Sequence, residues 1–110
     1  PNLSLISLNR PKAGVPTIMS YQEPYERLPE DVRDHHRAMR SLVEEIEAVD
    51  WYNQRVATTE DEQLKAILAH NRDEEMEHAS MLLEWLRRNM PGWDHELRDY
   101  LFTDKPIAHP

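Results

Sequence analysis

Residues 66–79 read AILAHNRDEEMEHA, and this stretch decides the fold. Its residues belong to a longer stripe with intervals of three and four, which is the period of an α-helix. The stripe consists of Leu64, Ile67, Leu68, Asn71, Glu74, Glu75, His78, Met81, Leu82 and Trp85. Polar residues replace apolar ones from Asn71 to His78 without a change of spacing, so they are predicted to lie on the core-facing side of the helix.

The ends of this helix have recognisable signals. Thr59 followed by Glu62 is a capping-box pattern, which predicts that the helix begins near Glu60. Pro91-Gly92 is predicted to end it. A short third helix is expected from Trp93 to Phe102.

A second long helix precedes this one. Pro29 is predicted to be its first residue, because proline suits that position. Its apolar stripe consists of Val32, His35, Met39, Leu42, Ile46, Val49 and Val56. The stripe ends near residues 57–59, so a tight turn should join the two long helices into an antiparallel hairpin.

The sequence therefore predicts an all-α fold, in which residues 28–102 form a helical hairpin with a short third helix. Residues 1–27 are expected to be an irregular N-terminal extension, and residues 103–110 an irregular C-terminal tail. Met19 is a candidate natural start, with residues 1–18 as an upstream extension.

Composition narrows the function. The chain has 110 residues, no cysteine and a formal net charge of -8. A net charge of this sign makes nucleic acid and anionic membrane poor partners and cations better ones. The absence of cysteine excludes disulfides and thiolate metal sites, and leaves carboxylate and histidine ligands, which favour iron or manganese. No segment has the length of a membrane span or the pattern of a secretory signal, so a cytoplasmic location is expected.

The two helices place acidic groups at the same level. Glu45 follows Leu42 by three residues and so falls on or beside the apolar stripe of its helix. Antiparallel pairing around the turn puts Glu45 within about one helical turn, some 5 Å, of Glu75. Glu75 and His78 form a Glu-x-x-His motif whose side chains project from one face.

This set is half of what a di-iron carboxylate bundle uses. Such bundles combine two Glu-x-x-His motifs with a lone glutamate from each of two other helices. One chain supplies Glu45 and the Glu75/His78 pair, and a twofold dimer would supply the other half and close a four-helix bundle. The sequence therefore predicts a dimer that binds two iron ions between its subunits.

Other interpretations of these residues remain open. The acidic level could be a solvated groove, or a salt-bridge layer with Arg40, Arg55 or Arg72. A protein of the same fold could buffer manganese or zinc without catalysis. A non-enzymatic helical dimerisation module with an acidic surface is the third reading.

Longer segments of the sequence resemble the encapsulated ferritins. They are EEIEAVDWY at 44–52, AILAHNRDEEMEHA at 66–79, EWLRR at 84–88 and YLFT at 100–103, and the similarity covers about residues 28–108. The resemblance implies a ferritin-like ferroxidase centre formed between two subunits, with Glu45, Glu75 and His78 as its iron ligands. It also implies rings of dimers held inside an encapsulin shell, where the oxidised iron is stored.

The resemblance implies roles for further residues. Glu44 and Glu47 correspond to a second metal site on the route of iron into the centre, with Trp51 beside it and Tyr52 close to the centre. The resemblance assigns a peripheral site for calcium or another divalent cation to His70, Glu74 and Glu77. The spacing of these residues also places them on a shared helix face. Family members usually carry a C-terminal shell-docking peptide, which is not obvious in this sequence. The apolar segment 3–8, which a proline-containing stretch follows, loosely resembles such a docking peptide at the opposite end of the chain.

Overall fold

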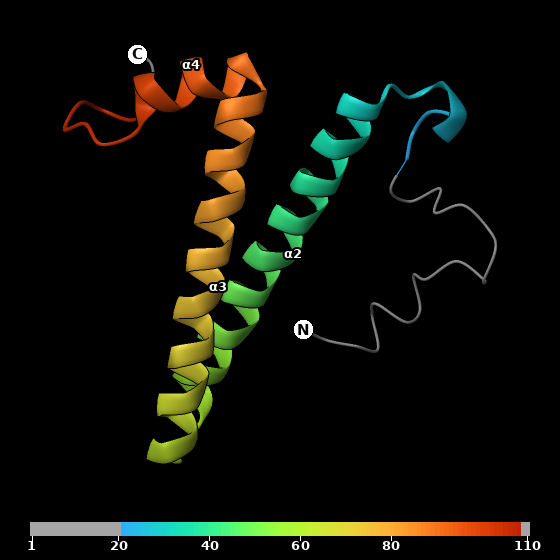
Figure 1. Ribbon diagram of the computed structural model, residues 1–110. Helices are drawn as coiled ribbons and strands as arrows, with labels where there is room; N and C mark the ends of the chain where they lie inside the picture. The colour runs from blue at the N-terminus through green and yellow to red at the C-terminus, as the bar shows by residue number, and fades with distance from the viewer. Residues whose placement is uncertain (1–20, 109–110) are drawn as a thin grey trace.

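The computed structural model describes residues 21–108, and these are helical apart from turns and bends. A short 3-10 helix, η1 (Tyr25–Arg27), is followed by two long helices, α2 (Glu30–Thr58) and α3 (Glu62–Asn89), and by the short α4 (Pro91–Tyr100). The long helices run antiparallel (Figure 1). The predicted all-α hairpin with a short C-terminal helix is confirmed. Predictions for residues 1–20, which include Met19 and segment 3–8, and for residues 109–110 lie outside the described residues.

The extension that precedes the hairpin is not wholly irregular. Tyr25–Arg27 form the single turn of η1, and Tyr21 stacks on His36 of α2 with a ring separation of 4.2 Å. Pro29 is the N-cap of α2 and Glu30 its first residue, so the predicted start was early by one residue. The acidic Glu30 suits this first turn because the backbone N–H groups there carry partial positive charge.

The second long helix starts two residues later than the predicted start near Glu60, with a different capping residue. Helix α3 begins at Glu62, and Asp61 is its N-cap, with the Asp61 carboxylate accepting a hydrogen bond of 2.9 Å from the Leu64 amide. Thr59 Oγ1 instead accepts from the backbone N–H of Asp61 at 3.3 Å. Asp61 caps the helix in place of Thr59, because its carboxylate accepts a hydrogen bond from the first turn and its negative charge is favourable at a helix N-terminus.

The boundary between α3 and α4 also differs from the prediction. Pro91 does not simply end α3; it occupies the first turn of α4, where the missing N–H group of proline costs nothing. Helix α4 therefore begins two residues before Trp93 and ends at Tyr100. Phe102 lies beyond it with a φ of 57°, in the left-handed region that interrupts a helix.

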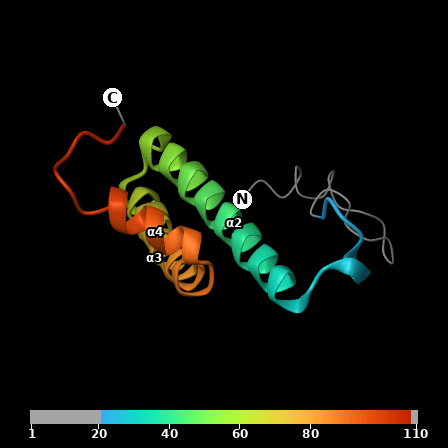
Figure 2. The ribbon, with the colours of Figure 1, turned by 90° about the horizontal axis from the view of Figure 1, so that it is seen from above.

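Helices α2 and α3 lie together near the turn and diverge toward their other ends (Figure 1). Figure 2 shows the same divergence from above, with α4 placed over the end of α3. The fully enclosed apolar residues in the described part of the chain are few: Ala38, Ala48 and Leu86. A single hairpin of this shape encloses little apolar surface.

Many apolar side chains of the predicted stripes are exposed in one chain. Ile46 is 56% exposed, Ile67 57% and Met81 58%. They belong to stripes that were predicted to face a core, and the hairpin alone does not cover them. The hairpin by itself therefore leaves apolar side chains of both long helices exposed.

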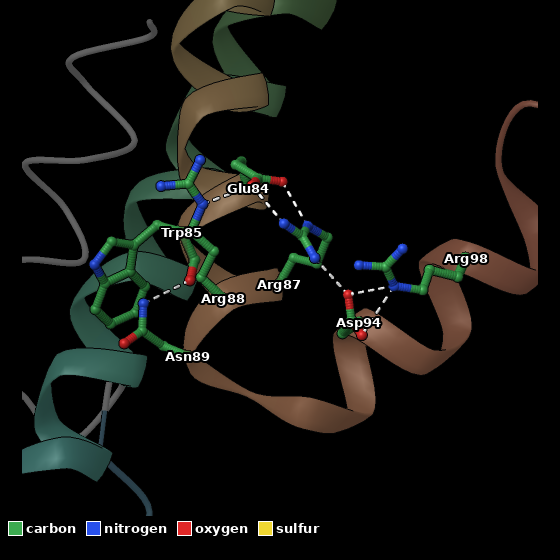
Figure 3. A network of polar contacts seen from close by, with 7 residues as sticks. All are labelled: Glu84, Trp85, Arg87, Arg88, Asn89, Asp94 and Arg98. Atoms are coloured by element: carbon green, nitrogen blue, oxygen red, sulfur yellow. Dashed lines mark hydrogen bonds and ion pairs between the residues drawn. The ribbon is translucent and has the colours of Figure 1, made fainter.

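Charged side chains fix α4 to the end of α3 (Figure 3). Arg87 binds both carboxylate oxygens of Glu84 at 2.6 and 2.8 Å and also contacts Asp94 of α4. Arg98 binds the same Asp94 at 2.9 Å. Hydrogen bonds from Arg87 and Arg88 lower the pKa of Glu84 to about 2. This network was not predicted from the sequence, because its residues come from two helices joined at an unforeseen angle.

Candidate metal centre

Three potential metal ligands meet between α2 and α3. Glu45 comes from α2, and Glu75 and His78 come from α3. One ligand atom from each lies within 4.8 Å of the other two. His78 Nδ1 is 3.6 Å from Glu45 Oε2 and 3.5 Å from Glu75 Oε2. Among residues 21–108 this is the one group of three or more acidic or histidine side chains with such geometry.

The backbone explains the meeting. Glu75 and His78 are three residues apart on α3, so both side chains leave the helix on nearly the same side. Glu45 reaches them because α2 runs antiparallel to α3 and the tight turn places residue 45 at their level. The height match predicted from the sequence is therefore present in the structure.

Glu45 is in an unfavourable environment for a negative charge. Its side chain is 25% exposed, and its Oε2 atom is buried and has no hydrogen-bond partner. The pKa of Glu45 is raised, first by a hydrogen bond shared with the Glu75 carboxyl, then by burial and by the charge of Glu75. Buried polar atoms are nearly always paired, so an orphan carboxylate oxygen here calls for a missing partner.

A divalent cation fits this donor set. It would pair with Glu45 Oε2 and neutralise two carboxylates that otherwise repel each other. Carboxylate oxygens together with an imidazole nitrogen suit iron, manganese or zinc. The same set suits calcium less well, because calcium prefers oxygen ligands alone. The cluster is open on one side, since His78 keeps 45% of its side-chain surface exposed. One chain therefore offers three ligands and leaves room for more.

Arginines do not fill the cluster. Arg72 donates to Asn53 and to Asp73, each at 3.1 Å, and Arg55 lies over the Tyr52 ring at 5.2 Å. Among the described residues, Glu45 forms an ion pair with His78 and with no arginine. The salt-bridge layer considered from the sequence has no support in this geometry.

Comparison with known proteins agrees with the geometry. The profile of the family described as EncFtn-like matches residues 20–104. The chain belongs to the EncFtn-like family. The resemblance to encapsulated ferritins found in the sequence is thereby confirmed.

Relatives of this EncFtn-like chain come from several bacteria. A "Ferritin-like protein" of Thermotoga maritima is 70% identical over 80% of this chain and 77% of its own length. An "Encapsulated ferritin-like protein" of Rhodospirillum rubrum is 60% identical over 81% of this chain, which spans 64% of that relative. A protein of Nitrosomonas europaea with a solved crystal structure is 66% identical, with a TM-score of 0.78 over 81% of this chain and 98% of that one.

The remaining predicted site residues of this EncFtn-like chain are not gathered in the same way. His70 pairs with Glu74 at 2.8 Å, while among the described residues the Glu77 side chain forms no ion pair with either of them. Glu44 and Glu47 are both exposed on α2, and neither joins a three-ligand group among the described residues. Their metal-binding roles stay predictions. Trp51 and Tyr52, which were predicted to lie near these sites, are half-buried on α2.

Proposed function

We propose that two copies of this chain pair and oxidise Fe²⁺ to Fe³⁺ at a di-iron centre between them. The observation that carries the proposal is the cluster of Glu45, Glu75 and His78, in which a buried Glu45 oxygen has no partner. The EncFtn-like family and the ferritin-like relatives support iron as the metal.

Two features of the single chain support pairing. Its cluster has two carboxylates and one imidazole, and exposed apolar residues flank it: Ile46 is next to Glu45, and Met81 is three residues after His78. A twofold axis beside this face would cover the apolar stripe and bring two clusters together. The combined set would contain four glutamates and two histidines, the complement of a ferritin-like di-iron bundle.

Each side chain has a role in this scheme. The Glu75/His78 pair of each chain would hold Fe²⁺, and Glu45 would supply a further carboxylate from the opposite helix. A cation at the cluster would favour ionised carboxylates at Glu45 and Glu75, because its charge offsets their mutual repulsion. Two bound Fe²⁺ ions would together give two electrons to dioxygen, which takes up two protons and leaves as hydrogen peroxide. The protein contributes position and charge neutralisation, and the metal undergoes the redox change.

The name of one relative supports a setting for the reaction. The Rhodospirillum rubrum relative is named as encapsulated, and we extend that association to this chain, with an encapsulin shell as partner and store for the ferric product. Rings of dimers are part of the same proposal. No helix in the described part of the chain is long and apolar enough to cross a membrane.

The test is iron oxidation by the full chain. Fe²⁺ is added in air and the ferric absorbance is followed, for the wild type and for Glu45→Ala, Glu75→Ala and His78→Ala. Each substitution should reduce the initial rate by at least about tenfold, since removal of a first ligand or its immediate support typically costs that much. Glu62→Ala is the control, because the Glu62 side chain is 84% exposed and far along α3 from the cluster.

The outcomes separate the competing functions. Oxidation that persists unchanged in all three cluster variants would refute the proposal. A chain that binds Zn²⁺ or Mn²⁺ but does not accelerate Fe²⁺ oxidation would be a metal buffer. A chain that pairs but binds none of these ions would be a dimerisation module.

A further inference from the structure

Arg72 lies where it could interfere with the cluster. It is three residues before Glu75 on α3, and residues three apart on a helix are neighbours on its surface. The structure directs its guanidinium elsewhere: Nη1 donates to Asn53 Oδ1 of α2 at 3.1 Å, and Nε donates to Asp73 Oδ1 at 3.1 Å. Glu75 therefore keeps both carboxylate oxygens for the cluster.

The usual behaviour of arginines in this chain is different. Arg37 pairs with Asp34 at 2.6 Å, and Arg87 pairs with Glu84 at 2.6 Å, in each case across three residues of one helix. In those pairs the acid precedes the arginine, and the order is reversed for Arg72 and Glu75. The reversed pair is still within reach of the long, flexible arginine side chain.

A guanidinium on Glu75 would oppose metal binding. It would neutralise one of the two carboxylates, and its charge would repel an arriving cation. The Arg72 side chain is only 23% exposed, so solvent screens its charge less than that of a surface arginine.

We propose that Asn53 restrains Arg72 and thereby keeps Glu75 available to the metal. Asn53 is a positioning residue: it touches no ligand atom, and it acts by holding the guanidinium toward α2. Asp73 adds a second contact from the same helix, but its side chain is 64% exposed. The hydrogen bond to Asn53 is the contact that joins Arg72 to α2. The proposal rests on the proposed function, because it takes Glu75 to be a metal ligand.

A purely structural role for the same hydrogen bond makes a different prediction. If the bond between Asn53 and Arg72 served only to set the register of α2 against α3, loss of either partner would damage the cluster equally. If Asn53 acts by restraining Arg72, loss of the arginine removes the need for the restraint. A double substitution separates the two cases.

The experiment measures Fe²⁺ binding without oxygen, by titration calorimetry on the full chain. The variants are Asn53→Ala, Arg72→Met, which keeps the aliphatic stem without the charge, and the combination of both. Gln54→Ala is the matched control, because Gln54 is the next residue and its amide contacts only the exposed Asp50 at 3.2 Å. Circular dichroism and sedimentation check that helix content and assembly are unchanged.

Asn53→Ala should bind Fe²⁺ about twofold to fivefold more weakly, the range expected for one competing, partly screened ion pair. Arg72→Met should bind at least as tightly as the wild type, and so should the double variant. Unchanged binding in Asn53→Ala overturns the proposal. So does an Arg72→Met variant that binds as weakly as Asn53→Ala, or a double variant that stays weak.

Failure of the inference is distinguishable from failure of the proposed function. A wild-type chain that binds no Fe²⁺, or binds it equally well after Glu75→Ala, overturns both. A wild-type chain whose Fe²⁺ binding depends on Glu75 but ignores Asn53 overturns only the restraint.

Discussion

Replacing Glu45 with glutamine should make the metal-free chain more stable and its metal response smaller. The ligand atoms of Glu45 and Glu75 are within 4.8 Å, and both side chains are 25% exposed. Two like charges at that distance repel by about 1 to 3 kcal/mol, depending on whether the surroundings resemble water or a protein surface. A glutamine at position 45 removes the repulsion and donates an amide hydrogen bond to Glu75 without needing a proton.

The size of this effect depends on pH in a defined direction. The pKa of Glu45 is raised in the folded chain, so between its ordinary and raised values the folded chain binds more protons than the unfolded chain. The stability of the wild type therefore falls as pH rises through that interval. Glu45→Gln lacks this dependence, so its advantage should be small in acid and reach its full size above the raised pKa.

Thermal unfolding at several pH values measures both effects. A gain of 1 kcal/mol corresponds to about 4–8 °C for a domain of this size. Saturating Zn²⁺, at 100 times its dissociation constant, should stabilise the wild type by about 2.7 kcal/mol and the variant by much less. A variant that unfolds at or below the wild-type temperature at pH 8 without metal refutes the reasoning, as does an undiminished response to Zn²⁺.

Three further predictions follow from other parts of the molecule. Leu86→Ala should lower the free energy of unfolding by about 2–5 kcal/mol in urea, since Leu86 is 0% exposed, while Leu64→Ala, at 45% exposed, should cost less; equal losses would contradict this packing. The pKa of Glu84 is lowered to about 2, so its contribution is present above its ordinary value of 4.5 and is lost as pH falls toward 2. Glu84→Gln should therefore speed amide hydrogen exchange in α4 at neutral pH, with the difference from wild type narrowing in acid; a difference independent of pH would contradict the ion-pair origin. Met81→Lys should shift sedimentation toward single chains, because pairing would bury its charge, whereas Ile107→Lys at an 83% exposed position should not; a paired Met81→Lys would exclude this face.

The sequence predicted the parts of the fold that depend on periodic patterns. The stripes with intervals of three and four gave two long helices, and the place where polar residues interrupt them gave Glu45, Glu75 and His78 a common level. These predictions succeed because a helix fixes the direction of each side chain from its position in the sequence. A tight turn between antiparallel helices then fixes which residues face each other.

Predictions that depended on competition between neighbouring residues failed. Thr59 and Asp61 could each cap α3, and only the folded backbone shows that the aspartate does so. Pro91 could end one helix or start the next, and it starts α4. The contact of Arg72 with Asn53 was invisible for a related reason: a long arginine side chain has several acceptors within reach, and sequence spacing alone favours Glu75.

The open side of the Glu45, Glu75 and His78 cluster has a kinetic consequence. An oxidase that is complete within one polypeptide turns over at a rate proportional to its concentration. If each polypeptide carries only half of the reacting pocket, then below the dissociation constant of the pair the rate rises with the square of concentration. Newly synthesised copies would be inert while dilute and become active where they are crowded, which would confine ferric product to the place of crowding.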